Sequence, residues 1–344
     1  MVCLLVAAAG CGEVPEPAGF PVGEGVSGGG DGSEELGRSD QGTPATTVVE
    51  RPVATTDFVP RRTDNSVAEL LIASNRGVLV GYGPQVEPVG GSLQDVPVSH
   101  VVDDLISGLV VQEIGVDGPV KWVSGVEAES NVISEGGAEL LDVGYVNGAS
   151  FAVLYSDSLV ELVRLVDGVR TPLVELGAGE ELVDASVSGG TIALALANAK
   201  CGDLHFYGVD GAQVQVNGPG EPDCIVPHRP TYGAIAMSPD GGSLAYTMVS
   251  YRDDLIEVAT EVVVRDLSSG EEWFRRKIGE DFDRIMALSF DGERVTYLRE
   301  STDASSVTVL ELTGRRDETQ IDLPDGADVM SVSFARLAVF TNAN

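Results

Sequence analysis

The sequence predicts an all-β protein, a six-bladed β-propeller of four-stranded blades preceded by a disordered tether. Three observations predict it: a repeated hairpin pattern, the regular spacing of its copies, and an incomplete repeat at each end. The clearest hairpin is Ala234–Thr247, where two apolar runs flank Pro239-Asp240-Gly241. Proline fixes φ for a turn, and aspartate followed by glycine supplies the short polar residue and the positive φ that reverse the chain.

The same hairpin recurs along the chain at a regular spacing. Further copies cover Asp104–Gln112, Gly144–Tyr155, Ala185–Leu196, Met286–Leu298 and, without its glycine, Val329–Thr341. The turn positions of successive copies lie 40 to 52 residues apart. A period of this length, built from short strands, is typical of a β-propeller.

Most repeats add two outer strands to the inner hairpin. We expect these pairs at Leu159–Leu165 with Thr171–Leu176, Asp203–Val209 with Gln213–Val216, Glu261–Leu267 with Glu272–Ile278, and Ser306–Leu312 with Thr319–Leu323. Asp-Gly turns at residues 167–168 and 210–211 are typical of hairpins.

The two ends of the repeat region predict how the ring closes. The last repeat reaches Asn344 after only two strands, while Gly77–Gly83 and Gln85–Val89 supply an outer pair near the other end. We therefore expect a propeller over residues 66–344, its last blade made of two C-terminal and two N-terminal strands, which leaves no open sheet edge. The alternative is seven blades, if Ser66–Ser74 begins a blade of its own.

The central repeat resembles a known family. Ser238-Pro239-Asp240-Gly241, followed by Leu244-Ala245-Tyr246, is similar to the repeat of the WD40-like (PD40) propellers of the TolB type, and Leu288–Val295 is a second copy. The resemblance implies a propeller that contacts other proteins of the cell envelope. It implies no catalytic residue, because the matching motif is a turn.

Residues 1–11 are expected to be a signal peptide. Ala8-Ala9-Gly10 before Cys11 resembles the lipobox of bacterial lipoproteins, which would leave Cys11 lipid-modified at the new N-terminus. The pattern departs from the usual one at Ala8. It also lacks a basic region and its apolar run is short, and a start codon further upstream would explain both of these features. The alternative is a chance cysteine after an apolar run.

Residues 12–60 are rich in Gly, Pro, Ser, Thr and Glu without an apolar period. Such a segment cannot bury enough surface to offset its chain entropy, so we expect a disordered linker. After a lipid-bearing cysteine, it would act as a tether to the membrane. The expected location is the bacterial cell envelope, outside the cytoplasm and anchored by the lipid alone.

The remaining cysteine pair, Cys201 and Cys224, is expected to form a disulfide. Both fall on the face of the ring that carries the loops between second and third strands and the connections between blades, and disulfides persist outside the cytoplasm. Two free thiols are the alternative. No second ligand at zinc spacing accompanies Cys201, so no metal and no cofactor are predicted.

The same face carries the longest loops, Asn217–Gly233 and Val249–Thr260. Long loops on a rigid scaffold are where binding residues usually lie. The candidate residues could hold a peptide or a sugar; they are His228, Arg229, Tyr232, Tyr251, Arg252 and Asp253. The alternative is ordinary solvated loops. His100, in a polar connector, and His205, in a strand, are expected to be structural.

The composition limits the partners. The chain has 54 acidic and 21 basic residues, a net charge of −33, which argues against nucleic acid and against anionic lipid surfaces. We expect a monomeric protein-binding or scaffold module of the envelope rather than an enzyme, with another envelope protein or peptide, or a glycan, as partner. The alternative is a propeller enzyme or carbohydrate-binding protein acting on envelope glycan or peptide.

Overall fold

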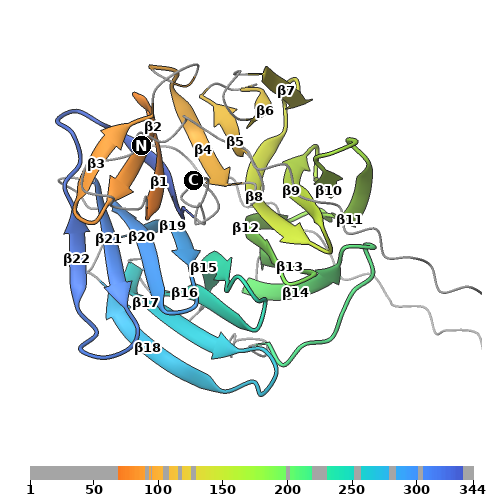
Figure 1. Cartoon of the computed structure of the whole chain (residues 1–344). Coiled ribbons are helices and arrows are strands. Elements are labelled where there is room, and N and C mark those ends of the chain that lie inside the picture. Colours follow the sequence, from red (N-terminus) through yellow and green to blue (C-terminus); the bar gives the residue numbers. More distant parts are fainter. Residues whose placement is uncertain are drawn as a thin grey trace, which may run out of the picture. The chain divides into compact units, whose positions relative to one another are not determined.

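The computed structural model describes residues 69–335, apart from 90–92, 94, 104–107, 115–117, 125–128, 199–201, 219–230, 252–256, 279–283 and 301–304. The expected signal peptide, its Cys11 and the expected linker lie outside the described residues. Six β-sheets surround a common axis, each with one strand next to the axis (Figure 1). The prediction of an all-β, six-bladed propeller is therefore confirmed.

Blades I and II follow the predicted order, in which each strand pairs with the next one along the chain. Blade I consists of β4 (Val98–Asp103), β5 (Gly108–Glu113), β6 (Val120–Ser124) and β7 (Glu129–Ser134). Blade II consists of β8 (Glu139–Val146), β9 (Ala149–Ser156), β10 (Leu159–Arg164) and β11 (Arg170–Glu175).

Blades IV and V repeat this arrangement. Blade IV consists of β15 (Thr231–Met237), β16 (Ser243–Tyr251), β17 (Glu257–Asp266) and β18 (Glu272–Ile278). Blade V consists of β19 (Arg284–Phe290), β20 (Arg294–Glu300), β21 (Ser305–Glu311) and β22 (Glu318–Ile321). The described residues contain no helix long and apolar enough to cross a membrane.

Blade III has three strands, β12 (Glu180–Ser188), β13 (Thr191–Asn198) and β14 (Gly202–Gly208). The fourth strand expected at Gln213–Val216 is wrong, because only an isolated bridge joins Gln213 to Tyr207. The N–H of Val214 still donates to the carbonyl of Phe206 in β14 at 2.9 Å, but beyond it the chain runs to the turn between β17 and β18 of blade IV. There the backbone N–H of Asn217 donates to the carbonyl of Leu267 at 3.1 Å, and its side-chain amide donates to the carbonyl of Ser268.

The ring closes differently from the prediction. Blade VI is made of one C-terminal strand, β23 (Val329–Phe334), and three N-terminal strands, β1 (Leu70–Ser74), β2 (Gly77–Tyr82) and β3 (Gln85–Pro88). β1 pairs with β23 through Leu70 opposite Phe334 and takes the place that we expected for a second C-terminal strand. All five residues of β1 are buried, so this apolar segment belongs to the closing blade and does not begin a seventh one.

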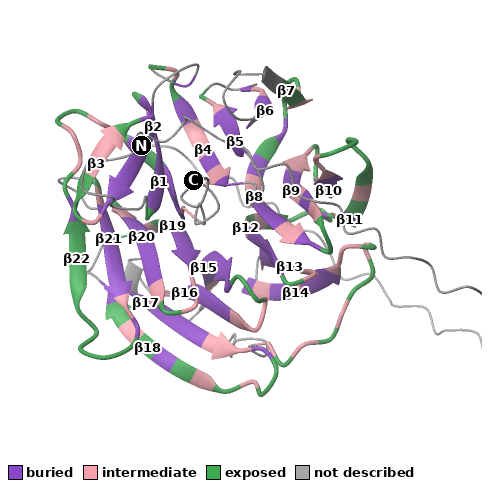
Figure 2. Cartoon of the chain, viewed as in Figure 1, coloured by how far each residue is buried: buried purple, intermediate pink, exposed green. Residues whose placement is uncertain are grey.

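The core lies between the blades rather than at the axis. Each of the six interfaces between neighbouring blades holds one cluster of buried apolar side chains. Because side chains alternate along a strand, β13 serves two interfaces: Ile192 and Leu194 pack towards blade II, whereas Ala193 and Ala195 pack towards blade IV. Middle strands such as β1, β2 and β5 are accordingly buried along nearly their whole length, whereas the outermost strands are more exposed (Figure 2).

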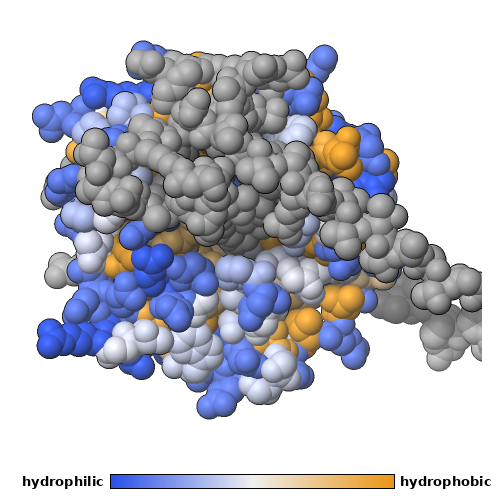
Figure 3. Space-filling view, in the orientation of Figure 1, coloured by the Kyte–Doolittle hydropathy of each residue, from blue (hydrophilic) through white to orange (hydrophobic). Residues whose placement is uncertain are grey.

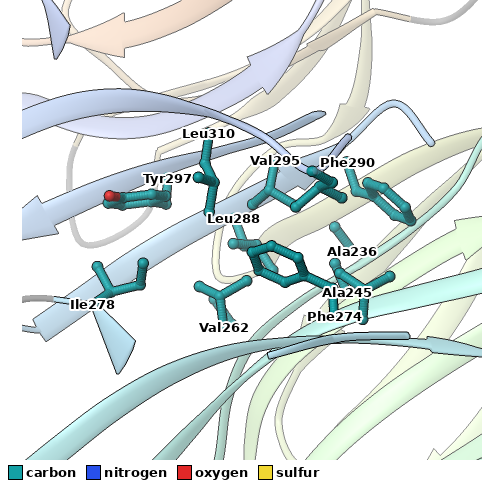
Figure 4. Close-up of a cluster of buried hydrophobic side chains, with 13 residues drawn as sticks. Ala236, Ala245, Val262, Phe274, Ile278, Leu288, Phe290, Val295, Tyr297 and Leu310 are labelled. Carbon is teal, nitrogen blue, oxygen red and sulfur yellow. The ribbon is translucent and has the colours of Figure 1, made fainter. Parts of the chain in front are cut away.

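The interface between blades IV and V illustrates this packing. Phe274 and Ala245 of blade IV face Leu288, Phe290 and Val295 of blade V (Figure 4). Full burial of a side chain of this size contributes about 1.5–3 kcal/mol. Each blade is therefore held chiefly by its two neighbours.

Candidate functional site

Most of the residues that the sequence proposed for the binding face lie outside the described residues. These are His228, Arg229, Arg252 and Asp253, together with the expected disulfide pair Cys201 and Cys224. Tyr251 is the last residue of β16. The loop between β14 and β15 therefore remains a prediction as a binding surface.

Tyr232 is placed differently from the expectation, within β15 and not on an exposed loop. Its side chain is 3% exposed and packs between blades III and IV. Its ring meets that of Tyr246 edge to face, with the centroids 5.5 Å apart. Tyr232 is thus part of the core.

The axis of the ring contains a cavity of about 90 Å³. All six inner strands line it, with His100, Asp142, Asp184, Ile235, Met286 and Met330 among the lining residues. Each inner strand also carries a register shift against its neighbour near this cavity. Such β-bulges redirect side chains, and the bulged Met286 and Met330 remain exposed at 54% and 42%.

Two carboxylates in the wall of the cavity connect blades II, III and IV. Asp142 on β8 accepts hydrogen bonds from Ser186 Oγ and the N–H of Val187 on β12, both at 2.8 Å. Asp184 on β12 accepts one from the N–H of Ile235 on β15 at 2.7 Å. Inner strands of different blades do not pair directly, so these side chains supply the missing backbone partners.

The protein around the cavity perturbs its ionisable groups. Burial raises the pKa of Asp184 to about 8, and the charges of Asp142 and Glu139 add to the increase. Hydrogen bonds from the backbone N–H groups of Ile235 and Ala185 oppose it. Burial lowers the pKa of His100 to about 4. At pH 7 the imidazole is therefore neutral and a large share of Asp184 is protonated.

His100 lies in β4, not in a connector as expected, and it lines a second space as well. This is a groove of about 390 Å³ between blades I and II. Glu139, Tyr155 and Asp157 of blade II contribute to its wall. His205, by contrast, lies in β14 with its Nε2 atom 2.9 Å from Asp203 Oδ2.

The sequence contained a signal for the two cavity carboxylates that we did not use. Glu139-Leu140-Leu141-Asp142 and Glu181-Leu182-Val183-Asp184 are the same pattern, Glu-Leu-apolar-Asp, at the same place in consecutive repeats. An aspartate at the same position of the inner strand in two consecutive repeats indicates a structural role at the axis of the ring. No group of three or more His, Cys, Asp or Glu side chains placed to hold a metal ion occurs within the described ranges.

No protein-family profile and no curated protein matches the sequence. Among solved structures, TolB from Acinetobacter baumannii is similar over 79% of this chain and 67% of its own, with 11% identity and a TM-score of 0.58. A putative TolB from Agrobacterium tumefaciens (14% identity, 57% of this chain and 66% of its own, TM-score 0.38) and an ancestral GH74 enzyme (11%, 83% and 39%, TM-score 0.43) are more distant.

At such low sequence identities a structural similarity is evidence for the fold alone, and of the three structures only TolB from Acinetobacter baumannii is similar enough to support a conclusion.

On the face shown in Figure 3, the described residues are mainly hydrophilic, with hydrophobic ones in separate small groups. The protein is a six-bladed β-propeller structurally similar to the propeller of TolB.

Proposed function

We propose that this protein is a lipid-anchored propeller of the bacterial cell envelope that binds another protein or peptide and serves there as a scaffold. In this proposal Cys11 carries the lipid, residues 12–60 form the tether, and the monomeric ring works outside the cytoplasm. The support comes from the TolB-like fold and from the lipobox-like Ala8-Ala9-Gly10-Cys11.

The main support for the proposal is that the central cavity is small and that polar side chains in its wall already have hydrogen-bond partners. Its volume of about 90 Å³ is well below the roughly 300–1,000 Å³ of sites for small molecules. The polar side chains of Asp142 and Ser186 in its wall are occupied with hydrogen bonds between blades. Both facts favour binding at the surface of the ring over chemistry at its centre.

The charge of the chain favours a basic partner. With a net charge of −33, the protein associates faster with positively charged partners and repels acidic ones. Binding should therefore weaken as the salt concentration rises.

Cross-linking in the envelope of a bacterial host tests the proposal. The wild-type chain should remain with the membrane and yield one defined cross-linked partner, and Cys11→Ser should release the ring. A variant in which a short Gly-Ser linker replaces residues 219–230, between the contacts of Asn217 and the start of β15, should stay membrane-bound and lose that partner. Equal release of wild type and Cys11→Ser would contradict the lipid anchor, and hydrolysis of envelope glycan or peptide by the purified ring would favour the enzyme alternative.

A further inference from the structure

The groove between blades I and II has the size of a ligand site. It opens where β5 and β9 end and β8 begins, and its volume of about 390 Å³ lies in the usual range of about 300–1,000 Å³. Its wall is of mixed character and includes the polar side chains of His100 from blade I and of Glu139, Tyr155 and Asp157 from blade II.

The floor of the groove is rigid. The side-chain amide of Gln112 donates to the carbonyl of Ala138 at 2.7 Å and accepts from the N–H of Leu140 at 2.9 Å, which fixes the start of β8 to the end of β5. On the other wall, Asp157 and Ser158 form a tight turn with φ values of 48° and 70°. A ligand would meet a preformed surface, which reduces the entropic cost of binding.

The carboxylates of the groove differ from those around it. Two nearby acidic side chains have cationic partners: Glu113 pairs with Lys121 at 2.5 Å, and Glu161 with Arg170 at 2.8 Å. Neither Glu139 nor Asp157 forms an ion pair with any residue that the structure describes. Glu139 is open to the groove, yet the surrounding protein raises the pKa of its carboxyl through burial. A cation in the groove would stabilise the ionised form of this carboxyl.

His100 adds a neutral acceptor. Ser99 Oγ donates to the carbonyl of Gln112 at 3.4 Å and lies 3.3 Å from Nδ1 of His100, an arrangement that favours the tautomer protonated at Nδ1. In this tautomer Nε2 carries no proton, and it has no hydrogen-bond partner among the described residues. The side chain lines the groove, and burial keeps the pKa of His100 near 4, so at pH 7 the ring accepts hydrogen bonds.

An aromatic ring completes the set. Tyr155 is the cross-strand partner of Glu139 in the β8–β9 pair, so the two side chains lie on one face about 5 Å apart at Cβ. A tyrosine ring beside a carboxylate suits a cation that carries several N–H donors, through cation–π attraction and hydrogen bonds together.

We propose that this groove binds the guanidinium or ammonium group of an arginine or lysine side chain presented by a partner protein. Glu139 and Asp157 balance the charge, Nε2 of His100 accepts one N–H, and Tyr155 packs against the stem of the side chain. That the cation belongs to a partner protein rests on the proposed function. That the groove recognises a guanidinium or ammonium group does not.

A binding titration with the full chain tests the site. The probe is N-acetyl-arginine-N-methylamide, and the control ligand is its citrulline counterpart, which has the same shape without the charge. We expect saturable binding of the arginine probe, followed by NMR at low salt. Glu139→Gln should weaken it about tenfold, because a neutral hydrogen bond replaces a charge-assisted one.

Two further variants separate the site from general electrostatics. Glu181→Gln removes the same charge from the equivalent position of blade III and should leave binding unchanged. Asp157→Asn should weaken binding and keep the fold, because asparagine also tolerates positive φ. Equal affinity for citrulline, an equal loss in Glu181→Gln, or the absence of saturable binding would overturn the proposal.

The outcome is distinguishable from that of the proposed function. Arginine binding that depends on Glu139, in a chain that yields no cross-linked partner in the envelope, would leave the groove established and refute the scaffold. A cross-linked partner that survives Glu139→Gln and Asp157→Asn together would support the scaffold and overturn the groove as its contact.

Discussion

A Cβ atom placed on Gly189 would lie 2.8 Å from the Cα of Gly241. The two glycines belong to the inner hairpin turns of blades III and IV, and both have positive φ, 58° and 71°. Ser188 Oγ, beside the first, also donates to the carbonyl of Pro239 at 2.9 Å. The turn motif that revealed the repeat is therefore also a contact between blades, so each of these glycines is required for two reasons.

The first prediction concerns this contact. Gly241→Ala should cost about 3 kcal/mol of the free energy of unfolding, because the new methyl group meets the neighbouring turn and an alanine is strained at positive φ. Gly292→Ala is the matched control: it occupies the same turn of blade V with a φ of 101° and has nothing within 4 Å of the added atom. Urea denaturation of both variants measures the difference. Equal losses would show that backbone strain alone accounts for the effect.

The second prediction concerns Gln112. Gln112→Met should cost about 2–4 kcal/mol, because it leaves the buried carbonyl of Ala138 and the N–H of Leu140 without their partner. The adjacent Glu113→Gln breaks only the partly exposed pair with Lys121 and should cost below about 1 kcal/mol. Thermal unfolding of the two variants checks the order, and a harmless Gln112→Met would refute the role of the amide as a link between blades.

The third prediction is a pH dependence. The pKa of Asp184 is about 8 in the folded state, against an ordinary value of 3.8, so the folded protein binds the extra proton between these limits. The stability that this proton confers is fully present below pH 4 and is lost as the pH rises through 8. The stability of wild type relative to Asp184→Asn should therefore fall from pH 4 to pH 8.

The control for this dependence is Asp266, whose pKa is lowered to about 2 by hydrogen bonds from Ser268 and Ser269. Its contribution is present above pH 4 and is lost as the pH falls through 2. The difference between wild type and Asp266→Asn should then be constant from pH 4 to pH 8. A flat profile for Asp184→Asn over the same range would contradict the protonated carboxyl.

The fourth prediction is the Cys201–Cys224 disulfide. A Cβ on Gly202 would lie 2.7 Å from the N atom of Tyr232, so the residue that follows Cys201 touches the start of β15, seven residues after Cys224. Mass spectrometry of the chain, exported and alkylated before reduction, should find the two cysteines joined. Alkylation of both thiols in the unreduced protein would show two free cysteines instead.

The six blades could be predicted from the sequence because Pro239-Asp240-Gly241 and its copies each specify a turn through their own residues, without distant contacts. Closure was mispredicted because the five apolar residues of β1 pair with a strand more than 250 residues away, and no local pattern specifies such a partner. The missing strand of blade III has the same origin: Gln213–Val216 has the composition of a strand, but Asn217 is held by the neighbouring blade. Packing between blades, which a single sequence does not display, decides both cases.

The candidate site was less predictable than the fold. The sequence directed attention to long loops, whereas the groove is formed by strand ends of two blades, and Glu139 and His100 are 39 residues apart. Only the repeated Glu-Leu-apolar-Asp pattern marked this region in advance. In a repeat protein of this kind, charged residues at equivalent positions of successive repeats therefore indicate a site better than loop length does.

The closing blade also sets the order in which the protein can be completed. Synthesis proceeds from β1 to β23, so the three outer strands of blade VI are made first and their inner strand last. Until Phe334 has left the ribosome, both ends of the array expose unpaired edges, and pairing across so long a stretch of sequence is slow. The nascent chain therefore cannot close the ring before β23 has been made, and the fold is completed only by a contact between the first strand and the last one.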